Sequence, residues 1–224
     1  MIELVGLDWD DVFTLGSTQG YYACYHEALV GVEANLDPEE ENRRIRSKWG
    51  AGHAAQLQDL LREYPEKVSK AIELYEGHFF GDTFTNCLEV VPGSQQLVSD
   101  LAEDYKLAVA TGGHPKILKE RVLPRFNFPE NIFSQIVTIY DLDDMSHAKP
   151  HPYMLNSILE TQKVAPENAV FVGDAANDVL MARNAGVEPI VVLTGQLNRE
   201  QAEDLQVRHI INDVTEIRTL LPRL

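Results

Sequence analysis

Residues 169–186 read AVFVGDAANDVLMARNAG, and this stretch decides the fold. Its first four residues form a short apolar run that contains β-branched side chains, which is typical of a buried strand. After Gly173 and Asp174 the pattern changes, and residues 176–185 are predicted to form a helix. The helix should end at Gly186, because glycine is favoured just beyond a helix C-terminus. A strand that leads at once into a helix indicates the repeating unit of a parallel α/β sheet.

The same alternation of apolar runs and helical patterns extends over most of the chain. Residues 94–105 carry their apolar side chains on one helical face, and Pro152 can open a further helix because proline is tolerated in the first turn. Strands that alternate with helices predict right-handed βαβ units, and therefore an α/β fold with a parallel sheet covered on both faces. The other strand-like runs are residues 2–7 (IELVGL), 106–110 (KLAVA), 136–139 (IVTI), 189–193 (PIVVL) and 208–211 (RHII).

Residues 16–88 have a different pattern, with apolar residues at helical spacing and no strand-like run. Pro38 and Pro65 stand where helices are expected to begin. We therefore predict a bundle of about four helices inserted after the first strand. The expected domains are a core of residues 1–15 and 89–224 and a helical domain of residues 16–88.

The composition excludes several classes of protein. Of the 224 residues, 35 are acidic and 19 are basic, giving a net charge of −16, which disfavours nucleic acid and anionic membranes as partners. An anionic substrate would therefore need a local cationic site. The two cysteines have no metal-ligand spacing and are too few for a disulfide framework. Without a signal peptide or an apolar run of about 18 residues, we expect a cytoplasmic protein that is not membrane-bound.

Four polar features follow predicted strand ends or precede a predicted helix, and open α/β sheets place their ligands at the strand ends. Taken singly, each also fits a plain structural role, as an acidic turn, a tight turn, a surface lysine or a helix cap. Their order along the chain brings all four to one edge of the sheet. They are Asp8-Trp9-Asp10, Thr111-Gly112-Gly113, Lys149-Pro150, and Gly173-Asp174 with Asp178.

This ordered set resembles the four motifs of the haloacid dehalogenase superfamily of hydrolases, and the resemblance covers essentially the whole chain. It implies a Rossmann-like core, with residues 16–88 in the place of the family's helical cap. It also implies that Asp8 is the nucleophile that forms an aspartyl-phosphate. Asp10 would be the general acid that protonates the leaving oxygen and then deprotonates the attacking water.

The resemblance further implies a set of binding residues. Thr111, the Gly112 amide and Lys149 would hold the phosphoryl oxygens. Mg²⁺ would be held by Asp8, Asp174, Asp178 and the backbone carbonyl of Asp10. The chemistry agrees, because a hard cation with oxygen ligands screens the repulsion between a carboxylate nucleophile and a phosphate ester. Phosphoryl transfer otherwise needs mainly positioning and charge stabilisation, and a covalent intermediate divides it into two easier steps.

The presence of Asp10 favours phosphate chemistry over dehalogenation and phosphonate cleavage. Residues 170–187 and 209–221 resemble phosphoglycolate phosphatases, so the expected function is a Mg²⁺-dependent phosphatase of a small, phosphoglycolate-like metabolite. The alternatives are a sugar phosphatase, a β-phosphoglucomutase-like phosphomutase and a catalytically idle member that binds a ligand or partner. Either a monomer or a homodimer fits the sequence.

Residues 43–53 (RRIRSKWGAGH) lie where the family's cap loop meets the core. Lys48 and Trp49 are candidates for contacting the rest of the substrate, although a basic helix end before a glycine turn explains them equally. In the core, Asp11 stands where the family usually has glycine. Either its carboxylate raises the pKa of Asp10 by repulsion between like charges, or its side chain points away from the site.

The histidines show no paired zinc-ligand spacing. His147 and His151 are four residues apart, but Pro150 and Pro152 should break the helix that would align them. We therefore expect structural or solvent-exposed roles for both.

Overall fold

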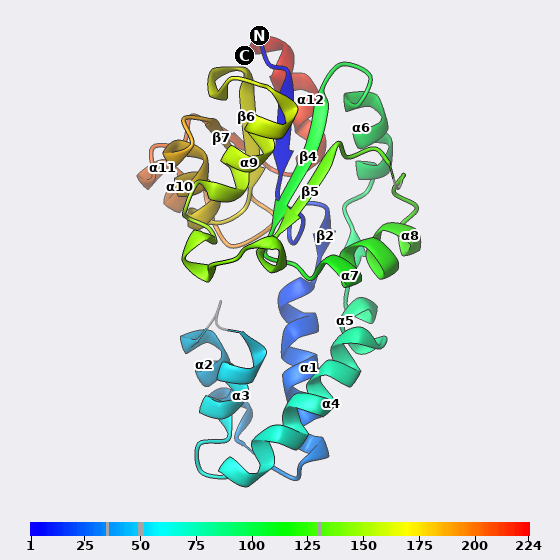
Figure 1. Ribbon diagram of the computed structural model, residues 1–224, viewed down its shortest axis with the longest axis vertical. Coiled ribbons are helices and arrows are strands. Elements are labelled where there is room, and N and C mark those ends of the chain that lie inside the picture. The colour runs from blue at the N-terminus through cyan, green and yellow to red at the C-terminus, as the bar shows by residue number, and fades with distance from the viewer. Residues whose placement is uncertain (35, 49–51, 130) are drawn as a thin grey trace. The chain divides into compact units, whose positions relative to one another are not determined.

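The computed structural model describes residues 1–34, 36–48, 52–129 and 131–224. These fall into two units, Met1–Leu15 with Glu89–Leu224, and Gly16–Leu88 (Figure 1).

The first unit is built on a six-stranded sheet in the order β5-β4-β1-β6-β7-β8, in which every neighbouring pair is parallel. Each of the six apolar runs overlaps one of these strands, so the predicted α/β class is confirmed. Strand β1 lies in the middle, with Leu4 beside both Lys106 and Ala169. The strands are β1 (Leu4–Leu7), β4 (Lys106–Thr111), β5 (Gln135–Thr138), β6 (Ala169–Gly173), β7 (Glu188–Val192) and β8 (His209–Ile211).

Helices cover the sheet because its central strands are apolar on both faces. Every residue of β1 and β6 is buried. Leu4 and Phe171 pack with Leu155 and Met181 in a cluster that joins the sheet to α9 and α10. The helices of this unit are α6 (Ser94–Leu101), α7 (Pro115–Ile117), α8 (Leu123–Arg125), α9 (Tyr153–Gln162), α10 (Ala176–Asn184), α11 (Arg199–Asp204) and α12 (Ile217–Leu220).

Shorter elements complete the first unit. A two-stranded antiparallel ribbon joins β2 (Thr14–Leu15) to β3 (Glu89–Val90), where the chain leaves and re-enters this unit. A π-helix, Leu118–Val122, joins α7 to α8. Pro124 follows it and has no N–H to continue an α-helical ladder, which accounts for the local change of helix type. The 3₁₀ turns are Ile139–Asp141, Met145–His147, Pro166–Asn168, Val214–Glu216 and Leu221–Arg223.

The described residues of the second unit form helices joined by turns, with no strand among them, in agreement with the predicted helical bundle. Pro38 opens α2 after Asp37, whose carboxylate accepts the N–H groups of Glu39 and Glu40. Pro65 opens a 3₁₀ turn (Pro65–Lys67) that leads into α4. A short fifth helix, which the periodicity did not indicate, precedes the return to the core. The helices are α1 (Ser17–Gly31), α2 (Pro38–Ser47), α3 (His53–Leu60), α4 (Val68–Phe80) and α5 (Thr83–Asn86).

Candidate active site

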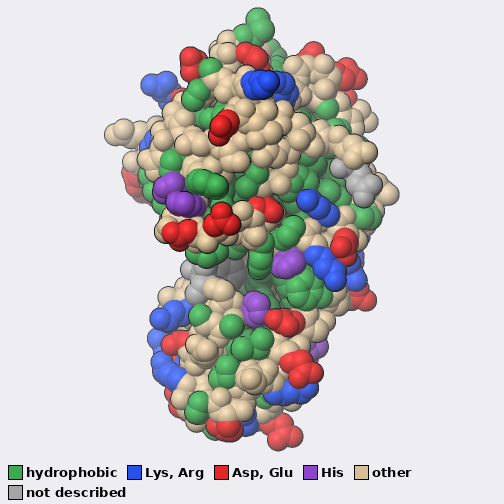
Figure 2. Space-filling model, in the orientation of Figure 1, with side chains coloured by type: hydrophobic (Ala, Val, Ile, Leu, Met, Phe, Trp, Pro, Cys, Tyr) green, Lys and Arg blue, Asp and Glu red, His purple; other side chains and the backbone are tan. Residues whose placement is uncertain are grey.

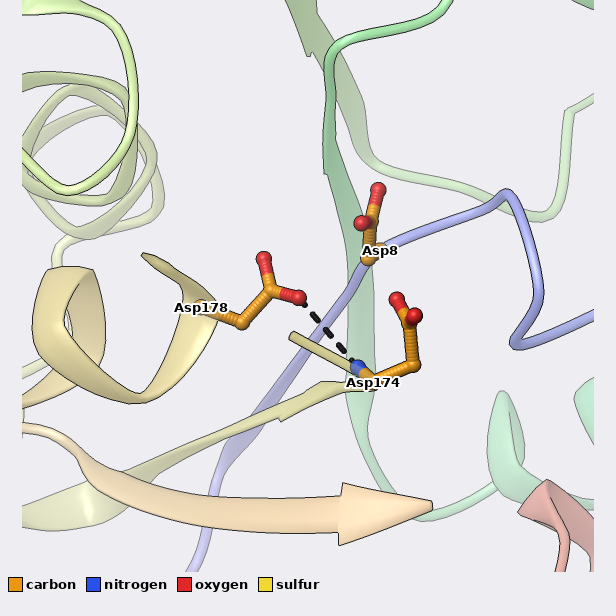
Figure 3. A group of neighbouring side chains, drawn as sticks. All are labelled: Asp8, Asp174 and Asp178. Atoms are coloured by element: carbon orange, nitrogen blue, oxygen red, sulfur yellow. Dashed lines mark hydrogen bonds between the residues drawn. The ribbon is translucent and has the colours of Figure 1, made fainter. Parts of the chain in front are cut away.

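Three carboxylates meet at the carboxyl edge of the central strands (Figure 3). Asp8 follows β1, Asp174 follows β6, and Asp178 lies in the first turn of α10. One oxygen of each lies within 4.8 Å of an oxygen of the other two. Asp174 and Asp178 are buried and Asp8 is partly buried, so the three carboxyl groups lie close together and largely away from solvent.

Backbone N–H groups hold each carboxylate in a fixed orientation. Trp9 N–H donates to Asp8 Oδ1 over 2.7 Å. Asp178 Oδ2 accepts the N–H groups of Asp174 (3.2 Å) and Ala175 (3.1 Å), the first of which is drawn in Figure 3. Gln196 N–H donates to Asp174 Oδ2 over 2.9 Å. The carboxylates are therefore oriented by the turns that carry them and by the loop after β7.

Two glycines leave the space that these carboxylates occupy. A Cβ at Gly173 would lie 2.4 Å from Asp178 Cβ, and a Cβ at Gly195 would lie 2.0 Å from Asp174 Oδ2. Both distances are far below van der Waals contact, so any larger residue would displace a carboxylate. Gly173 belongs to the predicted motifs. Gly195 was missed, and the only local signal was its place just after a predicted strand.

Lys149 enters the same cluster from the loop before α9. Its Nζ lies 3.0 Å from Asp8 Oδ2 and 2.8 Å from Asp178 Oδ1, and its side chain is largely buried. Burial alone would lower the pKa of Lys149, but the two neighbouring carboxylates outweigh it and raise the pKa. The lysine is therefore charged and neutralises part of the cluster.

Burial and the remaining negative charge together raise the pKa of two carboxyl groups, those of Asp8 and Asp174. Burial is the main cause that raises the pKa of Asp8, opposed by Lys149 and reinforced by Asp178. Burial, with repulsion from Asp8 and Asp178, raises the pKa of Asp174 to about 8. Three closely spaced oxygen donors that repel one another fit a hard divalent cation, which would relieve the repulsion.

A second group of residues lies at the adjoining end of β4. Thr111 is buried, and its Oγ1 accepts the N–H of Gly113 over 3.1 Å. A Cβ at Gly113 would lie 3.4 Å from Thr111 Oγ1 and 3.5 Å from Asp10 Oδ2. The side chains of Asp10 and Thr111 therefore both border Gly113. Gly112 is exposed, and a Cβ there would meet open space, so its amide lies at an accessible turn.

Asp11 has a left-handed backbone, with φ of 57°. Aspartate tolerates this conformation better than most non-glycine residues, which explains how it can replace the glycine usual in the family. Its N–H donates to the Thr14 carbonyl over 2.7 Å. The Asp11 charge contributes to the raised pKa of Asp174, a carboxyl group that the sequence analysis did not connect with it.

The substrate contacts predicted for the second unit stay predictions. Lys48 is exposed, and its carbonyl accepts Gln56 Nε2 over 2.8 Å. Trp49 lies outside the described residues.

As predicted, no continuous helix carries His147 and His151. Their ring centroids lie 4.8 Å apart, because a 3₁₀ turn and the bend after it bring them together without a continuous helix. The Nδ1 of His151 accepts the N–H of Tyr153 over 3.2 Å. That bond gives His151 a structural role, as predicted.

Comparison with known proteins identifies the family. A family model described as haloacid dehalogenase-like hydrolase matches residues 2–186. The chain therefore belongs to the haloacid dehalogenase-like hydrolase family, and the expected enzyme class is confirmed. One relative is named as a phosphatase of a phosphate monoester, phosphoglycolate.

Three of the matches show how far the likeness reaches. The phosphoglycolate phosphatase of Escherichia coli K12 is 40% identical over 82 residues, which are 37% of this chain and 31% of that protein. The pyrophosphatase PpaX of Bacillus mycoides is 30% identical over 95 residues, 42% of this chain and 43% of that one. The chain thus matches less than half the length of either relative.

A solved structure from Haemophilus somnus, titled a predicted phosphoglycolate phosphatase, has a TM-score of 0.80 at 21% identity and covers 98% of both chains. At this identity the match shows the fold alone. Among the described residues, no helix is long and apolar enough to cross a membrane.

Proposed function

We propose that the chain is a Mg²⁺-dependent phosphatase that acts on a small phosphorylated metabolite through an aspartyl-phosphate on Asp8. The observation that carries the proposal is the meeting of three carboxylates and one charged lysine at the ends of β1 and β6. This set supplies a nucleophile, oxygen ligands for a cation and a partner for phosphoryl oxygens. A phosphoglycolate-like substrate is preferred because the E. coli relative carries that name.

Asp8, Asp174 and Asp178, with the Asp10 carbonyl, would hold Mg²⁺. When bound, the ion neutralises charge on the carboxylates and on the transferring group. Asp8 is oriented by the Trp9 N–H on one oxygen, which leaves the other oxygen, now paired with Lys149, to attack phosphorus.

The phosphoryl oxygens compete with Asp8 for the Lys149 ammonium, and they accept the Thr111 hydroxyl and the Gly112 amide. Asp10 gives its proton to the leaving oxygen as the phosphorus–oxygen bond breaks. The same carboxylate then takes a proton from the water that attacks the phosphoenzyme, which releases phosphate and restores Asp8. These steps need no residue outside the motifs at the carboxyl edge.

Residues 16–88 are proposed to be a cap that excludes water during turnover, with Lys48 and Trp49 contacting the rest of the substrate. Acidic side chains are spread over the visible faces of both units (Figure 2). Together with the net charge of −16, this favours a small metabolite over nucleic acid or membrane as the partner. A cytoplasmic monomer or homodimer is proposed.

Phosphate release from a panel of small phosphate esters, including phosphoglycolate, tests the proposal. The assay is run with Mg²⁺ or EDTA on wild type, Asp8→Asn and Asp104→Asn, a matched change at an exposed residue. We expect Mg²⁺-dependent release that is lost only in Asp8→Asn. A folded wild type that releases no phosphate from any ester contradicts the proposal.

The panel also separates the alternatives. A sugar phosphatase would release phosphate preferentially from sugar esters. A phosphomutase would need a bisphosphate primer and would return isomerised ester in place of phosphate. A member that only binds a ligand would show binding without turnover. The presence of both Asp8 and Asp10 argues against this alternative, because ligand binding alone does not need both carboxylates.

A further inference from the structure

The loop after β7 connects the two segments that carry the carboxylates. Thr194 Oγ1 donates to the carbonyl of Asp11 over 2.5 Å, across 183 positions of sequence. Two residues on, the Gln196 N–H donates to Asp174 Oδ2. The Leu197 N–H donates to the Asp174 carbonyl over 2.9 Å. None of these loop residues belongs to the four motifs.

The sheet itself fixes the two segments only up to the ends of the strands. The last pairs between β1 and β6 are Leu7 beside Val172 and the bond from Asp8 N–H to the Val172 carbonyl, 2.8 Å long. Beyond that point no ladder bond joins β1 to β6 among the described residues, and contacts made by loop side chains and backbone groups connect the two segments. The hydrogen bond from the Thr194 hydroxyl is made beyond the end of this ladder, to the carbonyl of Asp11, the residue that follows Asp10.

We propose that Thr194 is a positioning residue for the cation site. Its hydroxyl holds the Asp11 carbonyl, and with it the turn carrying Asp8 and the Asp10 carbonyl, at a fixed separation from Asp174. The loop that supplies this hydroxyl also orients the Asp174 carboxylate, so one short segment sets both sides of the site. Mutation of residues that orient metal ligands typically costs about 10–100-fold in metal affinity. The inference rests on the proposed function for the Mg²⁺ site, but it does not depend on ester hydrolysis.

The test uses Thr194→Val, which removes the hydroxyl at nearly constant volume, and Thr194→Ser, which keeps it. Thr219→Val is the matched control, because Thr219 Oγ1 donates to the Glu216 carbonyl over 2.9 Å at an exposed position of the same unit. Mg²⁺ affinity is measured by calorimetry on protein freed of metal. Hydrogen exchange is measured for residues 8–14 in EDTA.

We expect Thr194→Val to weaken Mg²⁺ binding roughly tenfold and to speed exchange in residues 8–14. Thr194→Ser should stay near wild type, and Thr219→Val should change neither readout. The Mg²⁺ concentration for half-maximal turnover should rise by the same factor, while kcat at saturating Mg²⁺ changes less. If Thr194→Val does not fold, Thr194→Ala removes the same hydroxyl without filling the space.

Equal Mg²⁺ affinity and equal exchange in Thr194→Val and wild type would overturn the positioning role, as would a wild type that binds no Mg²⁺. A wild type that binds Mg²⁺ in a Thr194-dependent way but hydrolyses no ester would contradict the proposed function and support the positioning role. The two failures are therefore distinguishable.

Discussion

Lys149 Nζ lies 2.8 Å from Asp178 Oδ1, which joins the loop before α9 to the first turn of α10 inside the carboxylate cluster. The same ammonium lies 3.0 Å from Asp8 Oδ2. One lysine thus offsets part of the repulsion that would otherwise oppose the assembly of the site. In the metal-free protein it is a structural counter-ion as well as a proposed phosphoryl ligand.

Replacement Lys149→Met should destabilise the metal-free protein by about 3 kcal/mol, because it leaves buried carboxylates without their counter-ion. Mg²⁺ should recover part of the loss by binding the same carboxylates. Urea unfolding with EDTA or Mg²⁺ measures both effects. Lys149→Arg, which keeps the charge, is the control and should lose less stability. Equal stability of wild type and Lys149→Met in EDTA would show that the ion pairs contribute nothing.

The raised pKa of Asp174 predicts how stability depends on pH. Its ordinary value is 3.8, and in the folded chain it rises to about 8. Between these values the native state binds more protons than the unfolded state, so the metal-free protein should lose stability as pH rises. The expected loss is on the order of 2–5 kcal/mol between pH 4 and pH 8.

Asp174→Asn should flatten this dependence and make the metal-free protein more stable than wild type at pH 8. It should also abolish the stabilisation by Mg²⁺, which follows from binding to the native state alone. Thermal unfolding at several pH values, with EDTA or Mg²⁺, measures both. Asp104→Asn controls for net charge. A wild-type-like loss of stability with pH in Asp174→Asn would contradict the assignment.

Trp9 anchors the turn between Asp8 and Asp10. Its ring is buried and lies 5.0 Å from Phe13, 4.9 Å from Phe128 and 5.9 Å from Phe133. Within the described residues its indole N–H has no hydrogen-bond partner. The indole side chain therefore contributes to this turn through its packing and not through a hydrogen bond of its own.

Trp9→Ala should cost about 3–5 kcal/mol in unfolding free energy and should lower phosphatase activity in the folded fraction. Trp9→Phe keeps an aromatic ring and gives up no hydrogen bond, so it should cost roughly 1.5 kcal/mol. Denaturant titration measures the stabilities. If Trp9→Phe were as damaging as Trp9→Ala, the indole N–H would have a role that the packing does not explain.

The two cysteines should differ in reactivity. Cys24 is fully buried, and burial raises the pKa of its thiol to about 12, whereas Cys87 is partly exposed. At pH 8 the thiolate fraction of Cys24 is about 10⁻⁴, so iodoacetamide should label native protein at Cys87 and spare Cys24. Peptide mass spectrometry checks this. In urea both should react, and native Cys87→Ser should take up no label.

Much of the sheet and of the candidate site could be predicted because both leave local patterns. The apolar runs before Asp8 and Asp174 mark strands, and the polar residues directly after them mark a shared edge. The short helix α5 and the π-helix before Pro124 were not predicted, because neither has a distinctive periodicity.

Thr194 and Gly195 could not be found from the sequence for a different reason. Each acts through a contact with a distant residue, Asp11 in one case and Asp174 in the other, and such contacts leave no pattern around the residue itself. The contribution of the Asp11 charge to the raised pKa of Asp174 could not be predicted from the sequence for the same reason. The positions that tune the site were therefore visible only in three dimensions.

The central place of β1 also has a consequence for how the chain is made. Its partners β4 and β6 follow about 100 and about 165 positions later. At typical rates of synthesis they emerge roughly 5–20 s and 8–30 s after β1, so an apolar strand waits with both edges unpaired. Asp8 and Asp174 can meet only when β6 docks, which defers their mutual repulsion to a late step of folding.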